Sequence, residues 1–113
     1  MKKAVVTLIL MLTTMLPFPA KAADGKKLLE QCMLSDPFGT GYCLGLITGI
    51  RDATSIHQGV PGSFKVFCVP KGPLFKLVPV VVKFIQENPK YLHERDSTAV
   101  ILALTKSFPC KSK

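Results

Sequence analysis

The chain has 113 residues and is basic, with 15 lysines and arginines against seven aspartates and glutamates and a formal net charge of +8. Its lysines are scattered and no basic run is interleaved with aromatic residues, which argues against a nucleic-acid-binding protein. The motifs of serine hydrolases, zinc proteases and phosphate-binding loops are absent from the sequence, and we expect neither enzymatic activity nor a cofactor or metal.

Residues 1–22 have the pattern of a secretory signal peptide. Lys2 and Lys3 form a positive start, an apolar stretch covers residues 4–16, and Ala20-Lys21-Ala22 fits an A-x-A cleavage site. The apolar stretch is shorter than the roughly 18–20 residues that a membrane-spanning helix needs. We therefore expect cleavage, export, and a mature domain of residues 23–113 that has no membrane attachment.

The mature chain is expected to fold as one all-α domain of four to five helices. Asp24 can cap a first helix that ends near Met33, because its carboxylate can accept hydrogen bonds from free N–H groups. Residues 35–37, Ser-Asp-Pro, stop this helix. The apolar periodicity predicts a second helix from about Gly39 to His57.

Three glycines recur at every fourth residue of the second helix. Each of Gly41, Gly45 and Gly49 costs about 1 kcal/mol relative to alanine if it lies inside the helix, and close packing would have to offset that cost. We expect Gly45 and Gly49 to be helix-packing positions, where a neighbouring helix approaches within the monomer. The alternative is that they form a groove for a partner.

The second half of the chain predicts a loop and two further helices. Residues 58–63 are rich in turn-forming residues, and residues 64–68 are compatible with a short extended segment. Residues 74–88 are apolar over most of a helical circumference, which predicts a buried central helix with a kink or an irregular first turn at Pro79. A last helix is expected over residues 96–108.

Four cysteines lie in the mature chain: Cys32, Cys43, Cys68 and Cys110. An even number in a small exported protein indicates disulfides, and the spacings contain no C-x2-C pair of a zinc site. Cys32 lies late in the first helix and Cys43 early in the second. An antiparallel helix pair would place them side by side, and the same argument pairs Cys68 with Cys110.

An ordered set of short motifs spans most of the mature chain: Leu28-Leu29-x-x-Cys32, Tyr42-Cys43-Leu44-Gly45, Gly49 with Asp52-Ala53, Phe67-Cys68-x-Pro70, Val81-Val82 before Asn88-Pro89, and Ala103-Leu104-x-x-x-Phe108-Pro109-Cys110. This set resembles the Rap/Tai family of type VI secretion immunity proteins. The resemblance implies a small helical exported protein that binds a peptidoglycan-cleaving amidase effector in the periplasm and silences it by blocking its active site.

Blockade of an effector requires an element that enters or covers its cleft. The loop from His57 to Lys65 is the first candidate, with Phe64 as an aromatic anchor and Lys65 as a partner for acidic groups. The opposite interpretation is that Phe64 covers the core and the loop only connects two helices. The second candidate is the segment that contains Tyr91, His93 and Arg95.

Two alternatives concern the partner. The chain could form a homodimer, or it could be a helical structural or chaperone-like stress factor of the periplasm without a toxin partner. Acid-activated chaperones need many carboxylates that gain protons together. The seven carboxylates of the whole chain are few for such a switch.

Overall fold

The computed structural model describes residues 1–13 and 21–111. These residues form five α-helices, two short 3-10 helices and no β-strand beyond an isolated bridge between Asp24 and Arg95. The elements are α1 (Lys2–Thr13), α2 (Gly25–Met33), α3 (Pro37–Gln58), η1 (Leu74–Lys76), α4 (Leu77–Glu87), η2 (Pro89–His93) and α5 (Asp96–Ser107). The prediction of a small all-α fold with disulfides is confirmed.

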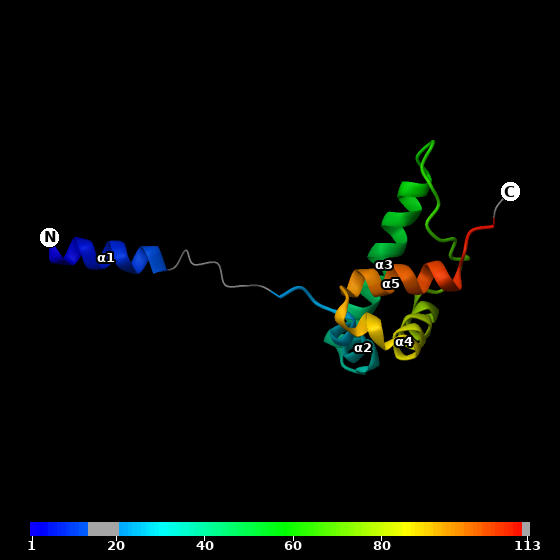
Figure 1. Cartoon of the computed structure of the whole chain (residues 1–113), viewed down its shortest axis with the longest axis horizontal. Coiled ribbons are helices and arrows are strands. Elements are labelled where there is room, and N and C mark those ends of the chain that lie inside the picture. Colours follow the sequence, from blue (N-terminus) through cyan, green and yellow to red (C-terminus); the bar gives the residue numbers. More distant parts are fainter. Residues whose placement is uncertain (14–20, 112–113) are drawn as a thin grey trace.

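Helix α1 covers most of the expected signal peptide and lies apart from the other helices (Figure 1). The last residues of the apolar stretch and Ala20 of the cleavage motif lie outside the described residues. Among the helices of the described ranges, none has the length and apolar character to cross a membrane. The signal peptide therefore stays a prediction.

Aspartates start two of the helices. Asp24 accepts a hydrogen bond from the Lys27 backbone N–H at 2.9 Å, and this bond lowers the pKa of the Asp24 carboxyl. Asp36 accepts from the N–H groups of Phe38 and Gly39, both at 3.0 Å. Because Asp36 is an N-cap and Pro37 the first helical residue, α3 begins before the expected Gly39.

Pro79 does not break helix α4. It lies in the first turn of α4, where backbone N–H groups have no partner within the helix, so the missing N–H costs little. The irregularity expected there is the single 3-10 turn η1 that precedes α4.

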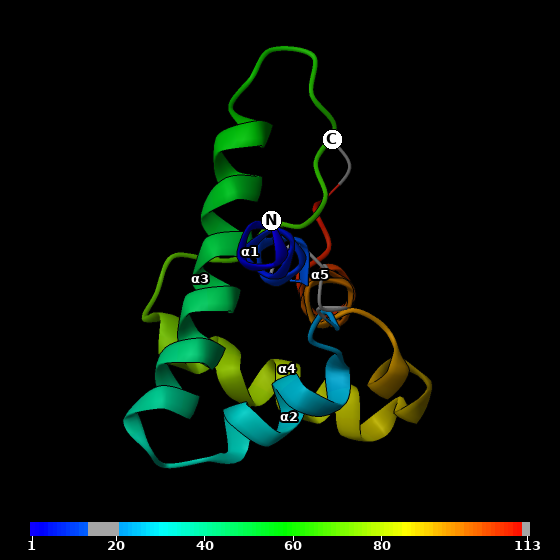
Figure 2. The same cartoon turned by 90° about the vertical axis from the view of Figure 1, so that its left-hand side faces the viewer.

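Helix α4 is central, as its apolar circumference predicts. It packs against α5, α2 and α3, and Figure 2 shows it running across the lower part of α3 and below α5. The core consists of buried side chains from α2, α3, α4 and α5 and from the segment before η1: Leu28, Cys43, Ile47, Phe67, Leu77, Val81, Phe84, Ile85, Ala99, Val100, Ala103 and Leu104.

Two disulfides cross-link the helical body. Cys32–Cys43 joins α2 to α3, and Cys68–Cys110 joins the segment before η1 to the residues after α5. The Cα atoms of the two pairs are 5.0 and 4.9 Å apart. These are the pairs expected from the helix order. Loops of these lengths correspond to roughly 3 and 4 kcal/mol in the chain-entropy model.

A polar contact links α3 to the start of α5. The hydroxyl of Tyr42 donates a hydrogen bond to Asp96 Oδ2, across 54 residues of sequence. Burial and this hydrogen bond raise the pKa of Tyr42 from its ordinary value near 10 to about 12.

We predict that this contact makes stability fall at alkaline pH. The unfolded tyrosine loses its proton near pH 10, whereas the folded one keeps it until about pH 12, so the contribution is present below pH 10 and is lost as pH rises toward 12. Melting temperatures between pH 8 and 12.5 should fall more steeply for the wild-type protein than for Tyr42→Phe. Equal slopes for the two proteins would contradict the linkage.

Candidate functional site

The C-terminal half of α3 and the loop after it project from the helical body, and we call residues 52–67 the arm (Figures 1 and 2). The buried residues of α3 are Gly39, Cys43 and Ile47, all in its first half. The second half of the helix therefore supports the arm and adds little to the core.

A defined turn closes the end of the arm. The Gly59 N–H donates to the carbonyls of Ser55 and Ile56 at 3.2 and 3.1 Å, and the Ser63 N–H donates to the Val60 carbonyl at 3.1 Å. Between Val60 and Ser63 lie Pro61 and Gly62, and Gly62 has a φ of 81°. This is the arrangement of a type II turn, in which the third position favours glycine.

The chain segment that returns from the end of the arm is fixed where it meets the helical body. Gln58 Nε2 donates to the Phe67 carbonyl at 3.0 Å, and the Phe67 side chain is buried in the core. The Cys68 N–H donates to the Phe108 carbonyl at 2.8 Å, next to the Cys68–Cys110 disulfide. The arm is thus attached to the body at both ends.

Large apolar side chains of the arm face solvent. Ile56, Val60 and Phe64 are 75%, 55% and 72% exposed, and the His57 ring meets the Phe64 ring edge-on at 5.3 Å. Lys65 is also exposed. The interpretation in which Phe64 covers the core is therefore wrong.

The second predicted set lies at the other end of the molecule, in η2 and just after it (Figures 1 and 2). Tyr91 stacks on Phe84 of α4 with ring centroids 5.3 Å apart, so its ring is used in packing. His93 and Arg95 are exposed. The structure does not bring this set together with His57, Phe64 and Lys65.

The expected packing role of the glycines is wrong. Gly45 and Gly49 are exposed, and a Cβ added at Gly41, Gly45 or Gly49 would meet no heavy atom within 4 Å. The four-residue spacing does place them on one face. However, Cys43 and Ile47 fix the buried face of α3, and the glycines fall on the opposite one.

The structure has a second exposed apolar surface, which the sequence did not predict and which we call the corner patch. It lies where α2 turns into α3 and contains Met33, Leu34 and Phe38, which are 61%, 47% and 73% exposed. In contrast to the arm, it lies on the body of the protein. No three His, Cys, Asp or Glu side chains gather as a metal site within the part of the chain that the structure describes.

Comparison with known protein families identifies a match. The family model of the Rap1a immunity proteins matches residues 24–110, a range that includes the arm and both disulfides. No curated protein and no solved structure matches the chain.

We predict that replacing the exposed glycines raises stability. Gly45→Ala and Gly49→Ala meet no neighbour and gain up to about 1 kcal/mol each in helix propensity. Gly39→Ala is the matched control, because its Cβ would lie 2.8 Å from Leu34 Cβ and should lower the melting temperature. Thermal unfolding followed by circular dichroism measures all three, and destabilisation by the first two would show that the glycines do pack against a neighbour.

Proposed function

Because the chain belongs to the Rap1a immunity protein family, we propose that it is a type VI immunity protein that binds a secreted peptidoglycan amidase and blocks its active site with the arm. The observation that carries the proposal is the exposed Phe64 on a projecting element that is anchored at both ends. In this role the protein binds its partner and catalyses no reaction.

The shape of the arm suits an inhibitor that enters a cleft. A binding element that is held before the encounter loses little conformational entropy on association. The type II turn, the Gln58–Phe67 hydrogen bond and the disulfide at Cys68 hold the arm in this way. A cleft that encloses the end of the arm would bury Ile56, Val60 and Phe64 together.

The positive charge of Lys65, next to the exposed Phe64, favours an acidic rim around that cleft. The negative charge of Asp52, at the start of the arm, is paired with Arg51 at a distance of 2.7 Å. Complementary charge around an apolar anchor raises the association rate and fixes the orientation of the partner.

The proposed site of action is the periplasm. Disulfides persist in oxidising compartments, and the described part of the chain has no free cysteine. We propose that residues 1–22 are removed during export and that the protein meets its effector where peptidoglycan is accessible.

Export gives a direct prediction. The mature protein recovered from the periplasm should begin at Ala23, as determined by N-terminal sequencing or intact mass. Ala22→Leu should leave the precursor uncut, because a signal peptidase site needs a small residue there. A protein that keeps Met1, or that stays in the cytoplasm, would contradict the signal peptide.

The arm gives the second prediction. Phe64→Ala with Lys65→Glu should weaken binding to the proposed amidase effector by roughly 30-fold or more, the size of an interface hot spot. The off-rate should rise and protection of cells should be lost. The melting temperature should change little, because Phe64 is not among the residues of the core or packed against it and contacts only the exposed His57 ring among the aromatic groups.

The matched control is Phe38→Ala with Lys27→Glu. Phe38 has the same exposure as Phe64, lies at the other end of α3 and belongs to the corner patch. This control should bind normally. Loss of binding in the control, with normal binding by the arm variant, would move the interface to the corner patch.

A further inference from the structure

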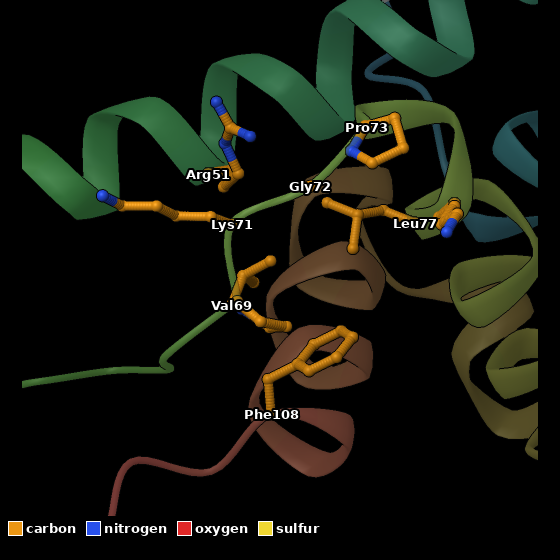
Figure 3. A pocket seen from close by; sticks show the side chains of 9 residues that line it. Arg51, Val69, Lys71, Gly72, Pro73, Leu77 and Phe108 are labelled. Atoms are coloured by element: carbon orange, nitrogen blue, oxygen red, sulfur yellow. The ribbon is translucent and has the colours of Figure 1, made fainter.

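A hollow of about 290 Å³ lies at the base of the arm (Figure 3). It is bounded by α3, the segment that leads into η1, the start of α4 and the end of α5. Apolar side chains form most of its lining: Val69, Pro70, Pro73, Leu77 and Phe108. Figure 3 shows Val69 and Phe108 on one side of the space and Arg51 and Pro73 on the other.

The charged residues that line the hollow are all basic. They are Arg51, Lys71 and Lys76, and no carboxylate is among the described residues of its lining. Their charged ends lie at the rim, because Figure 3 shows the Lys71 side chain extending away from the space and the Arg51 guanidinium turned away from Val69 and Phe108. Arg51 donates from Nε and Nη2 to Asp52 Oδ1 at 2.9 and 2.7 Å, which orients the guanidinium and leaves other N–H donors free. Even with Asp52 counted, the site keeps an excess of positive charge.

A smaller hollow lies beside the first one. It shares Arg51, Val69, Pro70 and Lys71 with it, and its described lining also lacks a carboxylate. The same two basic residues, Arg51 and Lys71, therefore line both hollows.

The wall of the hollow is formed in advance of any ligand. Cys68 is fixed by its disulfide and by the bond to the Phe108 carbonyl, and Pro70 and Pro73 restrict the backbone φ between Cys68 and η1. A site of this kind binds with little ordering of its own chain.

From these features we infer that the hollow is a binding site for a carboxylate carried on an apolar group, presented by a peptide segment of the protein partner. The inference rests on the proposed function for the identity of that partner. The apolar lining accommodates the hydrocarbon part of the ligand, and the carboxylate lies at the rim of the hollow, where the basic groups pair with it through charge-assisted hydrogen bonds. A volume of about 290 Å³ suits one or two residues.

The test uses short peptides and the purified mature protein. Backbone amide shifts would be followed by NMR during titration with acetyl-Leu-Glu-Leu-amide, its Glu-to-Gln analogue, and acetyl-Leu-Leu with a free terminal carboxylate. Saturable shifts should be confined to residues 69–77 and the neighbourhood of Arg51 and Phe108. The Gln analogue should bind at least tenfold more weakly.

The two carboxylate peptides distinguish the source of the charge. Binding of the Glu peptide assigns the site to an acidic side chain, and binding of the free-terminus peptide assigns it to a chain end. No saturable shift with either peptide, or equal binding of the Gln analogue, overturns the inference.

Charge reversal gives the matched comparison. Lys71→Glu with Lys76→Glu should abolish the saturable shifts, whereas Lys26→Glu with Lys27→Glu, an equal change of charge at exposed positions of α2, should leave them intact. Equal loss in both variants would show a general effect of net charge and overturn the site. Because these titrations need no effector, they can fail while the arm variant still loses binding to the amidase, and the reverse also holds.

Discussion

The chain returns from the arm to the helical body at one covalently fixed point. There the Cys68–Cys110 disulfide and the Cys68–Phe108 backbone hydrogen bond hold it against the end of α5. The arm lies before this attachment and the basic hollow directly after it, so both depend on the same constraint. Without the disulfide and this backbone hydrogen bond, burial of Phe67 and one side-chain hydrogen bond from Gln58 would have to fix the chain segment that returns from the arm. A fold that depends on a disulfide in this way suits an oxidising compartment.

The large apolar side chains of this small domain are buried in the core but exposed on the arm. Domains of this size bury a limited fraction of their surface. A large apolar side chain that stays exposed therefore contributes no burial free energy to a monomer that has little of it. Ile56 and Phe64 leave about three quarters of their surface exposed, although the core contains apolar residues from every helix of the body. Exposure of this kind on a projecting element is typical of a surface that another molecule covers. The same logic separates the arm from Tyr91, whose ring already packs on Phe84.

Local signals in the sequence predicted the helices well, and contacts between distant residues were harder to predict. The Asp24 cap and the cysteine pairing follow from residue type and helix order, and both agree with the structure. The face on which Gly45 and Gly49 lie could not be read from their spacing, because spacing shows that residues share a face and says nothing of which face is buried. The basic hollow was missed because Arg51, Lys71 and Phe108 are brought together only by the fold.

The most direct test of the arm as the inhibitory element is photo-crosslinking of the complex with the amidase. p-Benzoylphenylalanine would replace Phe64 on the arm, Phe38 in the corner patch, or His93 in η2, all of which are exposed. Mass spectrometry of the crosslinked peptides identifies the contacted residues. The arm proposal predicts crosslinks from position 64 to peptides that line the catalytic cleft of the amidase, and none to that cleft from positions 38 and 93. Crosslinks to the cleft from position 38 or 93, with none from position 64, would contradict it.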